Sequence, residues 1–165
     1  HKPKGYVSAT TDNEHKTVID LVPKDMYRDG LFPAGRLDGD TTGFVLITDD
    51  GDFAHSILSP KNHIMKTYHA TLQRAINENE SKKFEDGIVL SDGTVCMHST
   101  VKMLSSEPAV CEGKYHQVKR MFAATGNKVL ELKRVKMGNL SLDENLPSGQ
   151  CRMLTEKEVE LIKQK

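Results

Sequence analysis

The stretch that decides the fold runs from residue 35 to residue 60 and reads GRLDGDTTGFVLITDDGDFAHSILSP. Residues 43–48 form a compact apolar run that contains β-branched side chains, which is typical of a buried strand. Residues 49–52 predict a turn. Apolar side chains then recur at helical spacing up to residue 58, and the Ser59-Pro60 pair ends that helix. The stretch therefore predicts a strand, a turn and a helix.

Patterns on both sides of this stretch also predict a mixture of strands and helices. Strands outnumber helices, so we expect an α+β protein with a mixed, mainly antiparallel sheet flanked by helices. No linker rich in Pro, Gly or Ser divides the sequence, so residues 1–165 form one domain, either undivided or as two lobes that share one sheet. Strands are expected at residues 5–9, 66–72, 129–137 and 140–142 and, as several short ones, between 95 and 111; helices are expected at residues 78–86, over Tyr115 to Gly126, and after the capping box Thr155-Glu-Lys-Glu158.

The composition excludes a transmembrane helix and disfavours a disulfide framework. Charged residues make up 28% and hydrophobic residues 37% of the sequence, as in soluble globular proteins. No apolar run approaches the roughly 18 residues of a transmembrane helix, and the first ten residues lack the apolar core of a signal peptide. The three cysteines are an odd number and form no CxxC pair, so we expect a reduced, cytoplasmic protein. Because residue 1 is not methionine, we also expect an upstream segment.

The charges balance overall but are segregated along the sequence. Lys and Arg number 23, as do Asp and Glu, which excludes a uniformly basic nucleic-acid-binding protein. Residues 113–136 nevertheless carry seven basic residues and one acidic residue, whereas residues 38–52 carry five acidic residues and no basic one. Such an asymmetry can give a neutral protein one basic face, although charges scattered over a solvated surface produce the same pattern.

The segment GRLDGDTTG, residues 35–43, allows three interpretations. In the first, Asp38 and Asp40 open a calcium-binding loop, but such a loop needs flanking helices and normally ends on a glutamate. In the second, Asp38-x-Asp40-x-Thr42 is the nucleophile motif of an aspartyl phosphatase of the haloacid-dehalogenase type. That motif should follow a continuous apolar strand, and residues 31–36 do not predict one.

In the third interpretation, Arg36, Leu37 and Asp38 form one functional unit. An aspartate beside an arginine, at the edge of a turn, is a nucleophile or a base with a local counter-charge. The same arrangement also occurs where an aspartate merely caps a turn. These residues alone leave the choice open.

Four elements, taken in order, resemble the pseudouridine synthases that modify ribosomal RNA. They are KPKGY (2–6), GRLD (35–38), KTY (66–68) and EGKYHQVKRM (112–121). The resemblance extends from residue 2 to the C-terminal helix and is strongest to the branch of the small-subunit enzyme and its large-subunit relatives. It implies the pseudouridine synthase catalytic fold with a central RNA-binding cleft.

The resemblance also implies a reaction and its catalytic residues. Enzymes of this family break the N1–C1′ bond of a uridine in RNA, turn the uracil and rejoin it through C5, with no metal and no organic cofactor. Asp38 matches the essential aspartate, which acts on the sugar. Tyr68 matches the tyrosine that stacks on the flipped uracil, and Lys119 matches the basic residue that pairs with the aspartate.

Other matching positions are implied to bind substrate or to support the site. Arg36 matches the arginine that enters the RNA helix where the base has left it, and Val118 matches the aliphatic floor beneath the base. Substrate contacts are also expected from His116, Gln117 and Arg120. Structural support is expected from Lys2, Pro3, Gly35 and Leu37.

We therefore expect site-specific isomerisation of one uridine in 16S ribosomal RNA, with the base flipped out of the RNA. Such a site needs a basic rim that faces the RNA, and residues 113–136 are the best candidate for it. The same chemistry on 23S ribosomal RNA is the alternative, and a catalytically silent RNA-binding protein or the phosphatase is more remote. The expected partner is ribosomal RNA, free or in an assembly particle, with no membrane contact and with the protein as a monomer. Family members usually begin with a small RNA-binding domain, and this sequence does not contain one.

Overall fold

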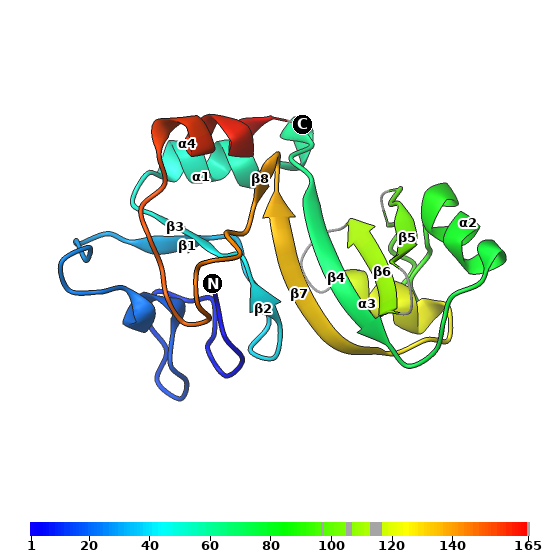
Figure 1. Cartoon of the computed structure of the whole chain (residues 1–165). Coiled ribbons are helices and arrows are strands. Elements are labelled where there is room, and N and C mark those ends of the chain that lie inside the picture. The colour runs from blue at the N-terminus through cyan, green and yellow to red at the C-terminus, as the bar shows by residue number, and fades with distance from the viewer. Residues whose placement is uncertain (97, 105–106, 113–116, 165) are drawn as a thin grey trace. The chain divides into compact units, whose positions relative to one another are not determined.

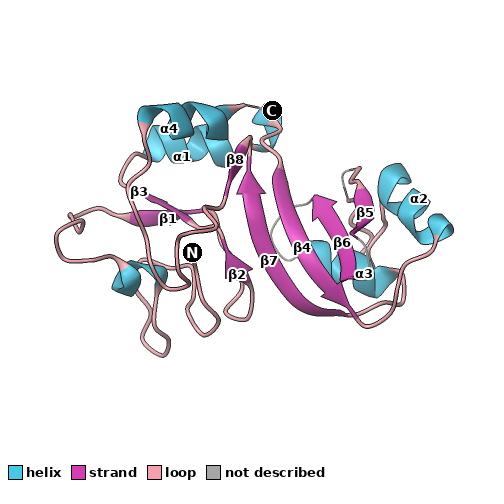
Figure 2. Cartoon of the chain, in the orientation of Figure 1, coloured by secondary structure: helices cyan, strands magenta, loops and turns pink. Residues whose placement is uncertain are grey.

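The structure, a computed structural model, describes residues 1–96, 98–104, 107–112 and 117–164, with the backbone alone for residues 103–104 and 107–112. The described residues form four α-helices, eight β-strands and two short 3₁₀ helices (Figure 1 and Figure 2). The contacts divide the chain into unit 1, residues 1–65 and 134–165, and unit 2, residues 66–133. None of the helices in the described part of the chain is long and apolar enough to cross a membrane.

Unit 1 consists of short strands and short helices. They are η1 (Val18–Leu21), β1 (Phe32–Ala34), β2 (Thr42–Gly43), β3 (Leu46–Thr48), α1 (Gly51–Leu58), η2 (Pro60–Asn62), β8 (Leu140–Ser141) and α4 (Glu156–Lys163), together with residues 134–137 of β7 (Val129–Met137). β1 and β3 form a two-stranded antiparallel sheet in which Pro33 lies opposite Ile47. α1 and α4 pack side by side, as Figure 1 shows.

One apolar core holds unit 1 together. Ile57 of α1, Met137 at the end of β7 and Ile162 of α4 are completely buried in it. The side chain of Asp50 caps α1 by accepting a hydrogen bond from the N–H of Phe53 at 2.9 Å. Each large side chain buried in this way contributes roughly 1.5–3 kcal/mol of transfer free energy. The remaining members of the core are Ala34, Phe44, Leu46, Ala54, Ile64 and Leu140.

Two glycines of unit 1 lie where another backbone segment approaches too closely for a side chain. At Gly43 (φ +103°), an added Cβ would lie 2.2 Å from the carbonyl oxygen of Arg134 in β7. Beside it, the N–H of Phe44 donates to Arg134 O at 2.8 Å, and the Nε–H of Arg134 donates to Phe44 O at 2.7 Å. At Gly138 (φ +55°), a Cβ would lie 2.1 Å from the carbonyl oxygen of Ile162. Glycine at these two positions therefore permits the close packing of this unit.

Unit 2 is built on a sheet. Its elements are β4 (Lys66–Leu72), α2 (Glu78–Asp86), β5 (Val101–Leu104), β6 (Glu107–Glu112) and α3 (Gln117–Ala124), together with residues 129–133 of β7. The strand order is β7-β4-β6-β5, and β6 is antiparallel to β4 and to β5. Alternate residues of β4, namely Tyr68, Ala70 and Leu72, are buried, so one face of this strand contributes to the interior of unit 2.

The two helices of unit 2 meet through aromatic rings. The ring of Phe84 in α2 lies 4.8 Å from the ring of Phe122 in α3, centroid to centroid, and both side chains are completely buried. α2 begins with a capping box in which Asn77 and Glu80 bond to each other's backbone. The Arg74 guanidinium contacts the carboxylate of Glu80 at 2.6 Å, and this contact holds the pKa of Glu80 below its usual value. The start of α2 is therefore fixed by both a cap and an ion pair.

The structure confirms the α+β class with a mixed, mainly antiparallel sheet. β4, α2 and β7 occupy residues 66–72, 78–86 and 129–137, as the sequence predicts. α4 begins directly after Thr155, whose side chain accepts a hydrogen bond from the N–H of Glu158 as the capping box requires. These elements have strong local patterns, which explains why their positions are predictable.

Three other predictions of secondary structure are wrong. The described residues 5–9 form no strand, because Gly5 (φ +87°) turns the chain there. The single strand expected at residues 43–48 is split into β2, which pairs with β7, and β3, which pairs with β1 in a separate sheet. Residues 31–36, for which the sequence predicts no strand, contain β1.

Arg152 anchors the start of α4 through two ion pairs. Its guanidinium contacts the carboxylate of Asp143 at 2.8 Å and that of Glu158 at 2.7 Å. The hydrogen bonds from Arg152, and then the bond from the N–H of Thr155, lower the pKa of Glu158 from 4.5 to about 2. The unfolded chain therefore takes up this proton at a higher pH than the folded chain. The stabilisation is complete above about pH 5 and is lost as the pH falls toward the folded-state pKa.

We expect Glu158→Gln to lower the free energy of unfolding by about 1 kcal/mol at neutral pH, since the pair is partly exposed. Glutamine preserves the capping box, so the change isolates the charge. The difference from wild type should shrink when urea unfolding is repeated at about pH 2.5. Glu160→Gln is the control, because Glu160 is exposed and pairs with Lys163 at the surface. A pH-independent difference for Glu158→Gln would contradict this role of the ion pair.

Candidate active site

The backbone around Asp38 is held by the N-terminal segment of unit 1. Ser8 is buried, and its hydroxyl accepts a hydrogen bond from Leu37 N–H at 2.9 Å and donates one to Leu37 O at 3.1 Å. After Asp38 in the chain, the carbonyl oxygen of Gly39 accepts a hydrogen bond from Gly5 N–H at 2.7 Å. The residues on both sides of Asp38 are therefore bonded to the same short segment.

Lys2 is a buried cation bonded to the same loop. Its ammonium donates to the carbonyl oxygens of Thr41 at 2.7 Å, Pro3 at 3.1 Å and Gly39 at 3.3 Å. Its backbone exchanges two hydrogen bonds with Gly43, at 2.8 and 3.0 Å. A buried ammonium needs several acceptors to offset its desolvation. Lys2 therefore fixes the turn after Asp38 through both its side chain and its backbone.

Asp38 itself opens a tight turn. The N–H of Thr41 donates to the carbonyl oxygen of Asp38 at 3.0 Å and closes the turn. The side chain of Asp38 is half-buried, with its Oδ1 shielded from solvent, whereas Arg36 is exposed and Leu37 is buried. Gly35, at the start of the motif, has a φ of +94°, which favours glycine there. The segment thus carries a carboxylate on a rigid loop, an arrangement suited to a nucleophile or a base.

Unit 2 carries the other residues of the predicted site. Tyr68, on β4, and Val118, on α3, are both almost completely buried. Gln117 and Lys119 flank Val118 on α3 and are half-buried. The structure therefore brings residues 117–119 together on one helix of unit 2.

Arg120 follows on the exposed side of α3. Its guanidinium contacts the carboxylate of Asp92 at 2.6 Å, which lowers the pKa of Asp92 far below its usual range. His116 lies outside the described residues. Because Asp38 belongs to unit 1 and Tyr68 and Lys119 belong to unit 2, their partnership stays a prediction.

One basic residue of the expected RNA-facing rim is structural. Arg134 is 3% exposed, and its Nε–H donates to Phe44 O within unit 1. The prediction that residues 113–136 form one exposed basic rim is therefore wrong for Arg134. A side chain so completely buried cannot contact a phosphate. Its burial was not predictable, because its hydrogen-bond acceptor is a backbone carbonyl, which leaves no pattern in the sequence. Lys128 is exposed, whereas Lys133 and Lys136 are half-buried, and Lys114 lies outside the described residues.

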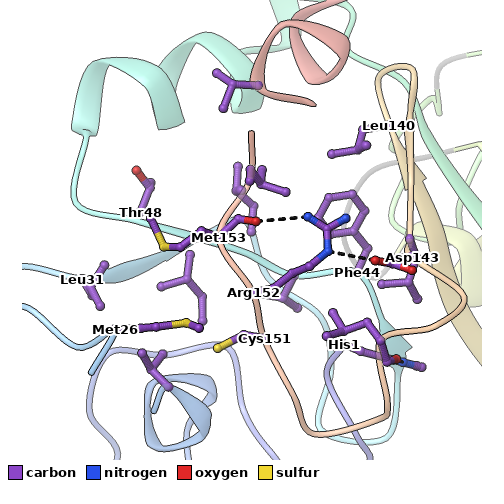
Figure 3. A pocket seen from close by; sticks show the side chains of 18 of the residues that line it. His1, Met26, Leu31, Phe44, Thr48, Leu140, Asp143, Cys151, Arg152 and Met153 are labelled. Carbon is purple, nitrogen blue, oxygen red and sulfur yellow. Dashed lines mark hydrogen bonds and ion pairs between the residues drawn. The ribbon is translucent and has the colours of Figure 1, made fainter. Parts of the chain in front are cut away.

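Unit 1 also contains an apolar cavity of about 220 Å³, shown in Figure 3. Arg152 lies at this cavity with its guanidinium bonded to Asp143 and to the carbonyl oxygen of Met153. Burial raises the pKa of the Cys151 thiol, which also lines the cavity, so this thiol is a poor nucleophile. None of the twelve site residues that the sequence predicts lines this cavity as far as the structure describes it.

Among the described residues, no three His, Cys, Asp or Glu side chains lie close enough together to hold a metal ion.

Sequence reasoning missed Ser8 and Gly5, which bond to the loop of Asp38. The signal for Ser8 is a hydroxyl inside an otherwise apolar run, since serine in that setting commonly bonds to nearby backbone.

Comparison with known proteins assigns the chain to a family. The family model described as RNA pseudouridylate synthase matches residues 1–124. The chain is 42% identical to the "Uncharacterized RNA pseudouridine synthase YtzG" of Bacillus subtilis, over 98% of this chain and 71% of that protein. It is 43% identical to the ribosomal small subunit pseudouridine synthase A of Salmonella typhimurium, over 96% of this chain and 70% of that protein.

Solved structures agree with this assignment. A crystal structure described as pseudouridylate synthase superimposes with a TM-score of 0.89 and 41% identity, over 98% of this chain and 70% of that chain. A Cbf5-Nop10-Gar1 complex matches with a TM-score of 0.58 at 19% identity, over 89% of this chain and 50% of that chain, and so shares the fold alone. The expected catalytic fold is thereby confirmed, and the calcium-loop and phosphatase interpretations of residues 35–43 are replaced. This chain belongs to the RNA pseudouridine synthase family and is an isomerase of that class.

Proposed function

We propose that this enzyme converts one uridine of 16S ribosomal RNA to pseudouridine, with Asp38 as its essential carboxylate. The proposal rests on one observation: in a chain of this family, hydrogen bonds to Leu37 and Gly39 hold the loop on both sides of Asp38. The relatives from Salmonella typhimurium and Escherichia coli that are named ribosomal small subunit pseudouridine synthase A support the choice of RNA. The same reaction on 23S RNA is the second candidate. Because its substrate is ribosomal RNA, we place the enzyme in the cytoplasm. We also propose that it acts as a monomer.

The reaction breaks the N1–C1′ bond and forms a C5–C1′ bond, and the uracil loses a proton at C5 and gains one at N1. Asp38 either adds to C1′ or removes the 2′ hydrogen. Both routes need an ionised carboxylate in contact with the sugar. The hydrogen bonds on either side of Asp38 support this role, because a fixed backbone reduces the reorganisation required to reach the reactive geometry.

The uracil has to leave the RNA stack before its bonds can be exchanged. Arg36, which is exposed, has the charge and length to fill the gap in the RNA or to bind a phosphate. Tyr68 offers an aromatic ring for stacking on the uracil, and Val118 an apolar surface beneath it. Gln117 and Arg120 also contact the RNA in this proposal. To bind a phosphate, Arg120 releases the carboxylate of Asp92, with which it pairs in this structure.

Incubation of the purified enzyme with 16S RNA, 23S RNA and small-subunit assembly particles tests the proposal. We expect pseudouridine at one uridine of 16S RNA, free or in the particle, and none in 23S RNA. On a minimal RNA that folds without magnesium, the rate should be the same in EDTA, because the proposed route uses no metal. Modification confined to 23S RNA would favour the second candidate.

Lys119→Met is expected to lower the single-turnover rate roughly 100-fold, if Lys119 is the cation that the resemblance pairs with Asp38. A carboxylate that loses a neighbouring cation is harder to ionise, so the acid limb of the pH–rate profile should move to higher pH. Lys119→Arg should keep most of the activity because it retains the charge. A weaker RNA affinity with an unchanged rate and pH profile would instead assign Lys119 to a phosphate contact.

A further inference from the structure

We infer that Ser8 is a positioning residue, which orients Asp38 through the backbone of Leu37. The inference rests on the proposed function, since the orientation of Asp38 matters only if this carboxylate takes part in the reaction. Ser8 lies outside the motifs that define the predicted site, and it is 8% exposed. It acts on the loop of Asp38 from a position 29 residues earlier in the chain.

The Ser8 hydroxyl makes two hydrogen bonds to one residue. It accepts from Leu37 N–H at 2.9 Å and donates to Leu37 O at 3.1 Å. Leu37 O belongs to the peptide group that joins Leu37 to Asp38. Leu37 N–H belongs to the preceding peptide group, so the two bonds tie the peptide groups on both sides of Leu37 to one hydroxyl and restrict the backbone rotation between them, whereas a single bond would hold only one of them. Ser8 therefore fixes the direction from which the chain enters Asp38.

The segment that carries Ser8 is itself anchored. The neighbouring Val7 donates its N–H to Lys16 O at 2.9 Å and accepts a hydrogen bond from Val18 N–H at 3.0 Å. Val18 is almost completely buried. The hydroxyl of Ser8 is therefore presented from a fixed backbone and does not follow the movements of the loop that it holds.

The opposite side of Asp38 is held independently. Gly39 O accepts hydrogen bonds from Gly5 N–H at 2.7 Å and from the Lys2 ammonium at 3.3 Å. Loss of the Ser8 hydroxyl thus releases one side of Asp38 while the other side stays bonded. The loop should remain folded, but the carboxylate should lose its fixed direction. A misplacement of about 1 Å in a catalytic group costs on the order of 100-fold in rate.

The test compares Ser8 variants in single-turnover assays at saturating RNA, well below the temperature of unfolding. We expect Ser8→Ala to lower the rate constant about 10- to 100-fold, with the RNA dissociation constant changed less than about twofold. The midpoint of thermal unfolding should fall by only about 2–4 °C. Ser99→Ala is the matched control, because Ser99 is also buried and its hydroxyl has no hydrogen-bond partner among the described residues. It should keep the wild-type rate.

Ser8→Thr and Ser8→Val form a second pair that is nearly identical in shape. Threonine keeps the hydroxyl and valine removes it, so any cost of the added bulk is shared by both. We expect the threonine variant to be at least about tenfold faster than the valine variant. Equal rates for the two, or a Ser8→Ala enzyme that loses only thermal stability, would overturn the positioning role.

The Asp38→Asn background separates this inference from the proposed function. In that background Ser8→Ala should cause no further loss of rate, because the group that it orients has been removed. An active Asp38→Asn enzyme would refute the proposed function whatever Ser8 does. An inactive Asp38→Asn enzyme together with a fully active Ser8→Ala enzyme would refute the inference about Ser8 alone.

Discussion

Asp38→Asn is expected to reduce pseudouridine formation by at least ~10³-fold while the protein stays folded and keeps its affinity for RNA. Asparagine has nearly the same shape as aspartate, so the hydrogen bonds that hold Leu37 and Gly39 should be retained. The substitution removes the charge and the nucleophilicity that either route of the reaction needs. Single-turnover assays at saturating RNA measure the loss, with RNA affinity and thermal unfolding measured on the same samples.

Asp40→Asn is the matched control for Asp38→Asn. Asp40 lies in the same turn but is exposed, and the substitution makes the same change of net charge. We expect it to lower the rate less than about tenfold, since this side chain has no assigned part in the chemistry. An Asp38→Asn enzyme that keeps tenths of the wild-type rate would remove Asp38 from the mechanism. Equal losses in both variants would assign the effect to the charge of the turn.

Gly43→Ala is expected to lower the free energy of unfolding by ~3 kcal/mol or more. The added Cβ would lie 2.2 Å from the carbonyl oxygen and 2.8 Å from the backbone nitrogen of Arg134, and backbone atoms cannot move aside as a flexible side chain does. Relief of this overlap requires the hydrogen bonds between Phe44 and Arg134 to break. Because Gly43 also pairs with the backbone of Lys2, activity should fall as well. Urea unfolding and the single-turnover assay measure the two effects.

Gly51→Ala is the control for the loss of a glycine. Gly51 is the first residue of α1, it has no positive φ, and an added Cβ would meet nothing within 4 Å. We expect this variant to be as stable as wild type or up to about 1 kcal/mol more stable. Wild-type stability in Gly43→Ala would contradict the close approach of β2 and β7.

Elements with a strong local pattern were predictable from the sequence. β4 alternates buried and exposed side chains, and the capping box at Thr155 marks the start of α4. The division of residues 43–48 between β2 and β3 was not predictable, because the two strands pair with different partners, β7 and β1, that only the folded chain brings to them. β1 was missed for a related reason, since Pro33 weakens a strand pattern that pairing with β3 nevertheless stabilises.

In the candidate site, too, the residues in local motifs were predictable, and those that depend on contacts distant in sequence were not. Asp38 and its neighbours are recognisable from motifs, but the residues that hold their backbone act over long sequence distances. Lys2 would ordinarily be placed at the surface, and only the carbonyl oxygens gathered around it in the folded chain explain its burial. Arg134 illustrates the opposite error, because a basic residue in a basic stretch turned out to be part of the interior. Ser8 carries no charge and follows no motif; its place in an apolar run signals a bond to backbone, but the partner, Leu37, is evident only in three dimensions.

The central claim is that this chain isomerises a uridine of 16S ribosomal RNA through Asp38. The most direct test is a map of pseudouridine in the ribosomal RNA of cells that lack the gene, complemented with wild type or with Asp38→Asn. We predict that one 16S position loses its pseudouridine on deletion, regains it with the wild-type gene, and does not regain it with Asp38→Asn. An unchanged 16S map after deletion, or full restoration by the Asp38→Asn gene, would contradict the claim.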